Sequence, residues 1–358
     1  MIYTNPNKKD LPDIQQLLSH IRECVNGFPV RHLMPYDHRI EGDNLFILNR
    51  TASGLFTLKP NVTTQACLYC GVPHFGHPLT ASWNYTERRD VVIQNMLREQ
   101  FELVMESHPL YNLLTRGVNV SNGRFRIINP YGIATAYGFP SPMVTFTSSL
   151  EIAAFYATHV KNADGQWIPV PAENEIGTCT GTVYALYLAH PFPIMVGLST
   201  IGKQVFRRPG NQRLFGFQVA KEMDLRSHPL VTGFEFKQSP DAARPFNSMS
   251  TDVEPDELIA EKARAIIKGN QISQAAFDRN CRNNPTDNRD ANARLLSEAG
   301  INIVANDPFV FTQQELNQVG DMQDEWMTLF QDVTTLHPGF DAILSDLLQV
   351  DIRQALNR

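Results

Sequence analysis

Residues 138–157 read GFPSPMVTFTSSLEIAAFYA. Gly138 and Pro140 interrupt regular structure at the start of this stretch, and residues 143–147 have the β-branched and aromatic composition of a strand. Ser148-Ser149-Leu150-Glu151 has the spacing of a capping box, and the residues after it are small and apolar. The stretch therefore predicts a strand over 143–147 that runs directly into a tightly packed helix beginning at Ser148.

The rest of the chain has a β-rich middle and helical ends. Apolar spacing predicts helices over 10–26, 87–106, 132–137, 258–267, 290–299, 326–333 and 344–352, with Thr312 and Glu315 forming a second capping box. Strand composition is found over 44–48, 54–58, 66–72, 181–188, 194–196, 212–220 and 233–237, and 161–180 is predicted to be a loop. This layout predicts an α+β fold with a mixed or antiparallel β core and helical N- and C-terminal segments. We divide the chain into an N-terminal helix and hairpin that pack on the core (1–63), a main domain (64–317) and C-terminal helices (318–358).

Composition excludes several classes of protein. The 358 residues are 42% hydrophobic with a formal net charge of −6, which is typical of a soluble globular protein. No apolar run approaches the roughly 18 residues of a membrane helix, and the first residues lack a secretion signal, so we expect a cytoplasmic protein without a membrane partner. Mild acidity without runs of Lys and Arg gives no electrostatic signal for nucleic acid. The five cysteines are too few and scattered for a disulfide framework, so we expect reduced thiols.

A local cluster of Cys67, Cys70, His74 and His77 has the ligand types of a structural zinc site. Four ligands within eleven residues, interrupted by Pro73, make an unusually tight zinc knuckle. Cys67 and Cys70 are also three apart in an expected strand, which points their side chains to opposite faces. We therefore predict structural thiols and no metal. Motifs of Rossmann dehydrogenases, P-loop NTPases and α/β-hydrolases are absent from the sequence.

The stretch 138–157 resembles, without gaps, the central motif of the FRG domain family, which runs roughly G-L-P-T-R-L-L-D-W-T-S-N-P-x-x-A-L-x-F-A. Other segments follow in the order of that family. These are Leu68-Tyr69-Cys70-Gly71, the helix 87–106, the strand 181–186, the Gln212-Arg213-Leu214-Phe215-Gly216-Phe217 element and the closing segment 295–301. The resemblance covers about residues 64–317.

FRG domains are distantly similar to ADP-ribosyltransferases, whose cleft combines an Arg-Gly or His-Gly strand, a Ser-Thr-Ser-like strand and helix, and a later strand bearing Glu or Gln. The resemblance implies that NAD, as a substrate, binds where the segments around residues 70, 147 and 212 meet. Breaking the nicotinamide–ribose bond develops oxocarbenium character, which needs a stacking ring, hydrogen-bond donors and an acceptor. The implied catalytic residues are Gln212, Ser148 and Thr147. The implied cofactor contacts are Tyr69, Cys70, Gly71, His74, Thr145, Phe146 and Tyr156.

Four positions depart from the family pattern. Cys70 and Pro142 stand where the family has Arg, Thr135-Ala136 replaces Gln-His, and Thr145 replaces Asp. Cysteine cannot make the bidentate phosphate contact of an arginine, and a glutamine cannot act as a carboxylate base. The packing residues of the motif remain, namely Gly138, Pro140, Ala153 and Ala157.

Other residues offer substitutes for the lost groups, each with a structural alternative. His74 or His77 can replace the missing Arg, or satisfy local hydrogen bonds. Arg207, Arg208 and Arg213 can steer a phosphate-bearing substrate, and Glu222 or Glu235 can supply a carboxylate, or all can be solvated surface charges. Thr147 and Ser148 can contact a ligand or cap the helix.

Two functions follow from the resemblance. In the first, the protein is an FRG-type, ADP-ribosyltransferase-like enzyme that uses NAD to modify a macromolecular target, as a toxin or antiphage factor. In the second, it is a catalytically degenerate FRG module that binds a nucleotide or a protein partner, with the C-terminal helices as the interaction surface.

Overall fold

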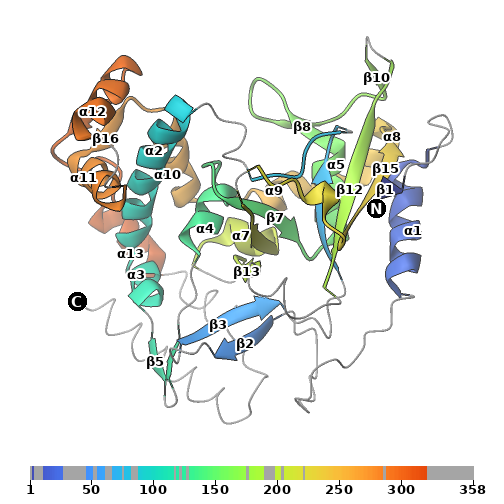
Figure 1. The fold of residues 1–358 in the computed structure, drawn as a ribbon, viewed down its shortest axis with the longest axis horizontal. Helices are drawn as coiled ribbons and strands as arrows, with labels where there is room; N and C mark the ends of the chain where they lie inside the picture. The colour runs from blue at the N-terminus through green and yellow to red at the C-terminus, as the bar shows by residue number, and fades with distance from the viewer. Residues whose placement is uncertain are drawn as a thin grey trace.

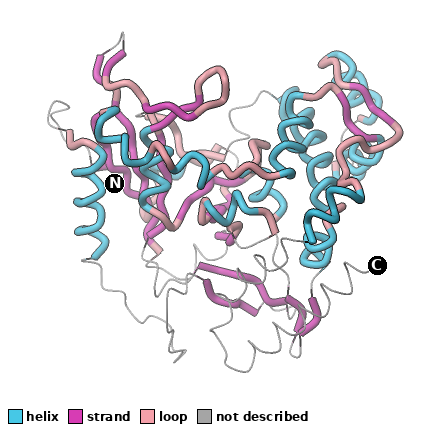
Figure 2. Tube along the Cα trace, turned by 180° about the vertical axis from the view of Figure 1, so that it is seen from behind, coloured by secondary structure: helices cyan, strands magenta, loops and turns pink. Residues whose placement is uncertain are grey.

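A sheet with helices on both faces and a separate group of helices make up the molecule, as the ribbon in Figure 1 shows. The computed structural model describes residues 2–3, 11–26, 46–50, 55–60, 67–74, 76–81, 88–116, 118–120, 123–125, 129–174, 177–188, 198–202, 205–220, 222–284 and 288–320. Seen from behind, most strands gather on one side and the long helices on the other (Figure 2).

The central sheet has seven strands in the order β1-β15-β12-β4-β7-β14-β13. β1 pairs parallel with β15, whereas the other neighbouring strands pair antiparallel. The strands are β1 (Ile2–Tyr3), β4 (Cys67–Val72), β7 (Met143–Thr147), β12 (Thr180–Tyr187), β13 (Leu198–Thr200), β14 (Leu214–Gln218) and β15 (Val231–Lys237).

One face of the sheet is covered by α1 (Ile14–Asn26) and α5 (Leu150–Thr158). Their apolar side chains share a core with alternate strand residues such as Tyr69, Val183 and Phe234. Burial of this apolar area is the main contribution that holds α1 and α5 on the sheet.

The alternate residues of the same strands point to the other face of the sheet and pack in a second core, which contains Leu68, Phe146 and Tyr184. That core continues into α2 (Arg88–Glu106), α4 (Pro130–Ala136), α10 (Leu258–Lys268), α11 (Gln274–Asn283) and α12 (Arg289–Glu298). We call α2, α10, α11 and α12 the helical unit. Within this unit, β16 (Gln271–Ser273), just before α11, pairs parallel with β17 (Asn302–Val304), which follows α12.

The remaining elements are short. Two antiparallel pairs are β8 with β9 and β10 with β11, and a four-stranded sheet has the order β2-β3-β6-β5. Their bounds are β2 (Phe46–Arg50), β3 (Leu55–Pro60), β5 (Val118–Val120), β6 (Gly123–Phe125), β8 (His159–Lys161), β9 (Trp167–Pro169), β10 (Glu173–Asn174) and β11 (Gly177–Thr178). The short helices are α3 (Pro109–Arg116), α7 (Arg207–Asn211), η3 (Leu225–Ser227), α8 (Pro240–Ala243), η4 (Arg244–Phe246), α9 (Met249–Val253) and α13 (Gln313–Gly320).

The predicted α+β class is confirmed, and so is the strand over 143–147 followed directly by a helix. The hairpin, the strand ending at Val72, the helix ending at Glu106 and the second capping box also agree with the structure. In that box Glu315 N–H donates to Thr312 Oγ1 at 3.2 Å, while Thr312 N–H donates to the Glu315 carboxylate at 2.6 Å.

Several boundaries were predicted wrongly. Helix α5 is capped by Ser149, whose hydroxyl accepts the Ile152 N–H, and not by Ser148. Helix α1 begins at Ile14 and not at residue 10, and Asp13 accepts the Gln16 N–H at its start. The expected loop 161–180 contains strand pairs, and α11 was missed because it has a polar composition.

Three predicted elements lie outside the described residues: the strand 194–196 and the helices 326–333 and 344–352.

Candidate functional site

Strands β4, β7 and β14 lie side by side, in that order. Thr147 at the end of β7 pairs with Tyr69 on one side and with Leu214 on the other. Just beyond the ladder, Ser148 N–H donates to the Arg213 carbonyl at 3.2 Å. The fold therefore brings together three segments that are about seventy residues apart along the chain.

Helix α5 sits unusually close to β4, and Gly71 permits this approach. A Cβ atom added to Gly71 would lie 1.8 Å from the Ala153 carbonyl oxygen and 2.7 Å from the Ala157 nitrogen. Ala153 and Ala157 are themselves fully buried. Gly71, an implied cofactor contact, thus has a packing role that accounts for the absence of a side chain.

The implied cofactor residues divide between the two faces of the sheet. Tyr69 lies in the core under α5, and its ladder partner Thr147 shares that face. Cys70 packs against the opposite core, in which Phe146 is fully buried. The structure therefore does not bring Cys70 and Phe146 to the face of Tyr69 and Thr147, contrary to the expectation of one shared concavity. Thr145 pairs with Gly216 and is half-buried.

The thiols near the proposed cleft are poor acids. Burial raises the pKa of Cys70 to about 12, and it raises the pKa of Cys67 to about 12. Both are therefore neutral near pH 7 and are not nucleophiles. Cys67 lies in the core under α5, so the prediction that Cys67 and Cys70 point to opposite faces is confirmed. Among the described residues, no group of three or more His, Cys, Asp and Glu side chains is placed to hold a metal ion.

The N-terminus of α5 already holds a carboxylate. Thr147 Oγ1 accepts the Ser149 N–H at 3.1 Å, and Ser149 Oγ donates to Glu151 Oε2 at 3.0 Å. Glu151 also forms an ion pair with Arg22 of α1 at 2.7 Å. The backbone donors and the positive end of the helix dipole are thus used internally, which leaves Thr147 with a capping role.

Gln212 is fixed by contacts to two other elements. It is the C-cap of α7 and not part of a strand, and it is only 5% exposed. Its amide nitrogen donates to Tyr156 Oη at 2.9 Å and to the Val253 carbonyl at 3.0 Å. These two bonds use both hydrogens of the amide, so Gln212 connects α7, α5 and α9. Burial also raises the pKa of Tyr156 above its ordinary value.

The predicted basic patch meets an internal anion. The N–H groups of Arg207 and Arg208, at the start of α7, donate to Glu257 at 3.0 and 3.1 Å. The same carboxylate accepts from Tyr137 Oη at 2.6 Å, and the Arg208 guanidinium lies 4.9 Å from the centre of the Tyr137 ring. Arg213 is exposed at the turn into β14, with a positive φ of 47°.

The substitutes for the missing charges lie apart from the three strands or at their margin. His74 is exposed on the turn after β4, and burial, with His74 and Arg226 nearby, lowers the pKa of His77. Glu235 is buried on β15, which β12 and β4 separate from β7. Glu222 is exposed and has a positive φ of 68°.

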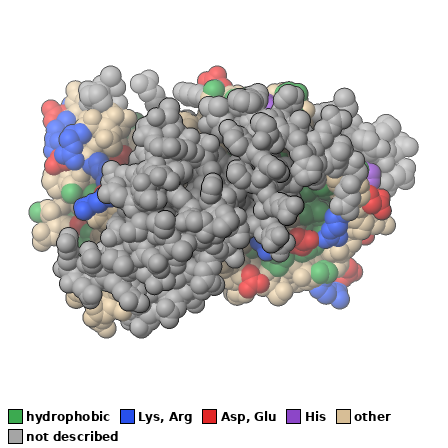
Figure 3. All heavy atoms as spheres, turned by 90° about the horizontal axis from the view of Figure 1, so that it is seen from below, with side chains coloured by type: hydrophobic (Ala, Val, Ile, Leu, Met, Phe, Trp, Pro, Cys, Tyr) green, Lys and Arg blue, Asp and Glu red, His purple; other side chains and the backbone are tan. Residues whose placement is uncertain are grey.

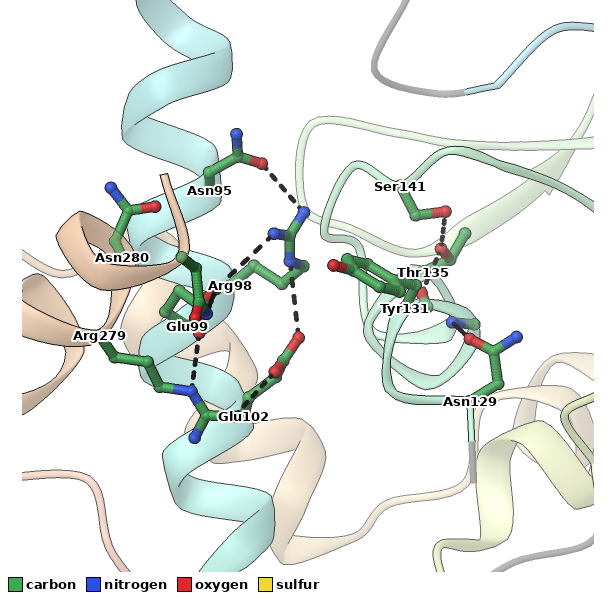
Figure 4. A network of polar contacts seen from close by, with 12 residues as sticks. Asn95, Arg98, Glu99, Glu102, Asn129, Tyr131, Thr135, Ser141, Arg279 and Asn280 are labelled. Carbon is green, nitrogen blue, oxygen red and sulfur yellow. Dashed lines mark hydrogen bonds and ion pairs between the residues drawn. The ribbon is translucent and has the colours of Figure 1, made fainter. Parts of the chain in front are cut away.

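A buried network of charges lies elsewhere, between α2 and α11 (Figure 4). Arg279 of α11 contacts Glu99 at 3.0 Å, Glu102 at 3.3 Å and Glu106 at 2.7 Å. On α2 itself, Arg98 lies 3.6 Å from Glu102. The Arg98 guanidinium also lies 4.7 Å from the centre of the Tyr131 ring on α4, a contact that joins α2 to α4 (Figure 4).

A shallow cavity of about 520 Å³ lies beside this network and not beside the three strands. It is lined by residues of α11 and one residue of α2, namely Ala275, Asp278, Arg279, Arg282, Asn283 and Leu103. None of the implied catalytic or cofactor residues lines it. In the view from below, Lys and Arg side chains are visible at this end of the molecule and at the opposite end (Figure 3).

The sequence carried one signal for this network. Glu99, Glu102 and Glu106 are three and four residues apart, which places them on one face of the predicted helix 87–106. Their partner Arg279 lies 173 residues beyond Glu106 and had no such signal.

No protein-family model matches the chain, and neither the curated proteins nor the solved structures contain a match. Within the described residues, no helix combines the length and the apolarity that crossing a membrane requires.

Proposed function

We propose that this protein is a catalytically degenerate FRG-type module, which keeps the frame of an ADP-ribosyltransferase-like cleft but acts by binding. The observation that carries the proposal is the Gln212 side chain, which is only 5% exposed and whose amide nitrogen is held by Tyr156 and the Val253 carbonyl. A group that stabilises an oxocarbenium-like transition state must reach the substrate and accept from it. Gln212 cannot turn its amide toward a ligand without leaving the Val253 carbonyl unpaired.

The contacts of the other implied site residues also support a structural role for the three strands and α5. Gly71 admits α5 to the sheet, Thr147 caps that helix, and Cys70 is neutral on the opposite face. Each of these three residues has a packing or capping role that needs no ligand. The positions that the FRG motif uses for packing are kept, whereas those that it uses for charge are not.

A protein partner fits the frame better than a nucleotide does. Phosphate groups bind favourably at helix N-termini with free N–H donors. At α5 the first turn carries Glu151, and at α7 the first N–H groups bind Glu257. A pyrophosphate would therefore meet negative charge at both helices next to the three strands.

The strand order favours a second candidate, the NAD-dependent transferase that modifies a macromolecule as a toxin or antiphage factor. The order β4-β7-β14 is the arrangement in which residues near 70, 147 and 212 meet. In this case Ser148 and Gln212 would have to leave their present contacts when NAD binds.

One assay separates the candidates. The full chain is incubated with NAD, and released nicotinamide is measured by chromatography, with an unrelated NAD-consuming enzyme as the positive control for the assay. We expect no release above the protein-free blank. We also expect no thermal stabilisation by NAD or ADP-ribose; stabilisation without release would contradict the protein-partner assignment and support a nucleotide-binding module.

Variants make the outcome specific. Nicotinamide release that disappears in Gln212→Met, but persists in Gln218→Met, would refute the degenerate reading and establish the transferase. Gln218 is the matched control because it is an exposed glutamine at the end of β14, six residues further along the chain. Circular dichroism confirms that both variants fold.

A further inference from the structure

The charges between α2 and α11 do not balance. We call Arg98, Glu99, Glu102, Glu106 and Arg279 the α2–α11 charge cluster. Three carboxylates face two guanidinium groups, which leaves one negative charge in excess when all are ionised. The side chains of Arg98, Glu99 and Glu102 are 7%, 4% and 11% exposed, so water compensates this excess poorly.

Of the three carboxylates, Glu102 lies farthest from the guanidinium of Arg279. Glu106 receives two hydrogen bonds from Arg279, at 2.7 and 2.8 Å, and its side chain is 37% exposed. Glu99 contacts Arg279 at 3.0 Å and also accepts from Asn283 at 3.1 Å. The contacts of Glu102 are longer, at 3.3 Å to Arg279 and 3.6 Å to Arg98. Other titratable or charged groups nearby are Tyr131, which lies beyond Arg98, and Asp278 and Arg282, which line the adjacent cavity.

We propose that the α2–α11 charge cluster is a proton-dependent joint: α11 is held most firmly against α2 when Glu102 carries a proton, and the contact loosens when that proton leaves. A proton on Glu102 removes the excess charge and its repulsion with Glu99 and Glu106. This regulatory role is independent of what the module binds.

The titration of Glu102 supports the same conclusion. Burial, followed by the charge of Glu99, raises its pKa to about 7, although Arg98 and Arg279 act in the opposite direction. When the contact with α11 opens, the pKa of Glu102 moves back toward its ordinary value of 4.5. The docked state therefore binds more protons between these values, so docking weakens as pH rises from 4.5 to about 7.

Other contacts between α11 and the rest of the molecule limit how far α11 can move from α2. Gln100 Oε1 accepts the Ser273 N–H at 2.7 Å at the start of α11, and Ala276 and Phe277 are buried in the core. These contacts do not titrate near neutral pH. The joint is therefore expected to open more often at high pH without complete detachment of α11.

Hydrogen exchange tests the proposal. Protection of the amides of 274–283 is measured in the full chain from pH 6 to 8, after correction for the intrinsic rate of exchange. With the two pKa values above, protection in the wild type should fall about tenfold over this range. Glu102→Gln mimics the protonated side chain, so its protection should change by less than about twofold.

Glu261→Gln is the matched control, because Glu261 is an exposed glutamate of α10 that lies outside the cluster. It should retain the wild-type dependence. A wild type without pH dependence, or a dependence that persists in Glu102→Gln, would overturn the proposal.

A second measurement needs no variant to fold. Carbon-13 NMR of the glutamate carboxyl groups in the wild type should show one carboxyl titrating near pH 7. Titration of every glutamate carboxyl below about pH 5 would contradict the joint, since ordinary glutamates titrate near 4.3.

Discussion

The α5–β4 contact and the α2–α11 contact solve the same packing problem in different ways. At the first, Gly71 and two alanines remove side chains so that a helix lies directly on the sheet. At the second, long charged side chains fill the space between two helices and neutralise one another incompletely. The first contact depends on shape alone, whereas the second depends on protons as well.

The largest expected effect is at the α5–β4 contact. Gly71→Val should destabilise the fold by about 4 kcal/mol or prevent folding, because its Cβ would meet backbone atoms that cannot rotate away. Urea unfolding followed by circular dichroism measures this. The control is Gly165→Ala, which has open space around it and tests only the cost of a positive φ. Equal effects of the two substitutions would show that close packing does not decide this contact.

Arg279→Met should have the next largest effect, about 3 kcal/mol of lost stability at pH 7, because three carboxylates then lose their shared partner. The loss should shrink at pH 5, where the carboxylates can take up protons. Arg244→Met removes an exposed ion pair with Asp241 and should change stability little. A loss that is the same at both pH values would mean that Arg279 acts by packing.

His108 lies just beyond the end of α2. Its contribution to the free energy of unfolding should depend on pH in the direction opposite to that of Glu102. Its ring is buried between Phe206 and Phe311, and burial lowers its pKa from 6.5 to about 4. The unfolded chain therefore binds more protons between these values, and stability is lost as pH falls. Relative to His108→Asn, the wild type should lose about 2 kcal/mol between pH 7 and 5.

The contribution of Glu102 over the same interval has a similar size and the opposite sign, so the two slopes cancel in the wild type. Urea unfolding of the wild type, His108→Asn and Glu102→Gln at both pH values separates them. The His108 assignment fails if His108→Asn and the wild type change in parallel.

The sequence was most informative where structure is local. The strand over 143–147, the turn signals around Gly138 and the amphipathic α2 follow from composition and spacing within one stretch. The meeting of β4, β7 and β14 was predicted from a family resemblance, because no pattern within a stretch specifies strand order. Placement of Ser149 instead of Ser148 at the cap depends on one residue of register, which the two adjacent serines leave open.

The contacts of the site were beyond sequence reasoning. Whether Gln212 faces a ligand or Tyr156 depends on the approach of α5 and α9, which are 56 and 41 residues away. The division of Cys70 and Tyr69 between two faces follows from strand alternation, yet its meaning depends on what covers each face. The α2–α11 charge cluster needs Arg279, whose helix was not predicted.

Glu257 connects the start of α10 to two other segments of the chain. It precedes the first turn of α10, and its carboxylate also holds the start of α7 and the hydroxyl of Tyr137. Three donors from two distant segments bind this one side chain. The start of α10 is therefore attached to α7 and to Tyr137. Because none of these bonds involves α2 or α11, loosening of the α2–α11 contact should leave the start of α10 in place.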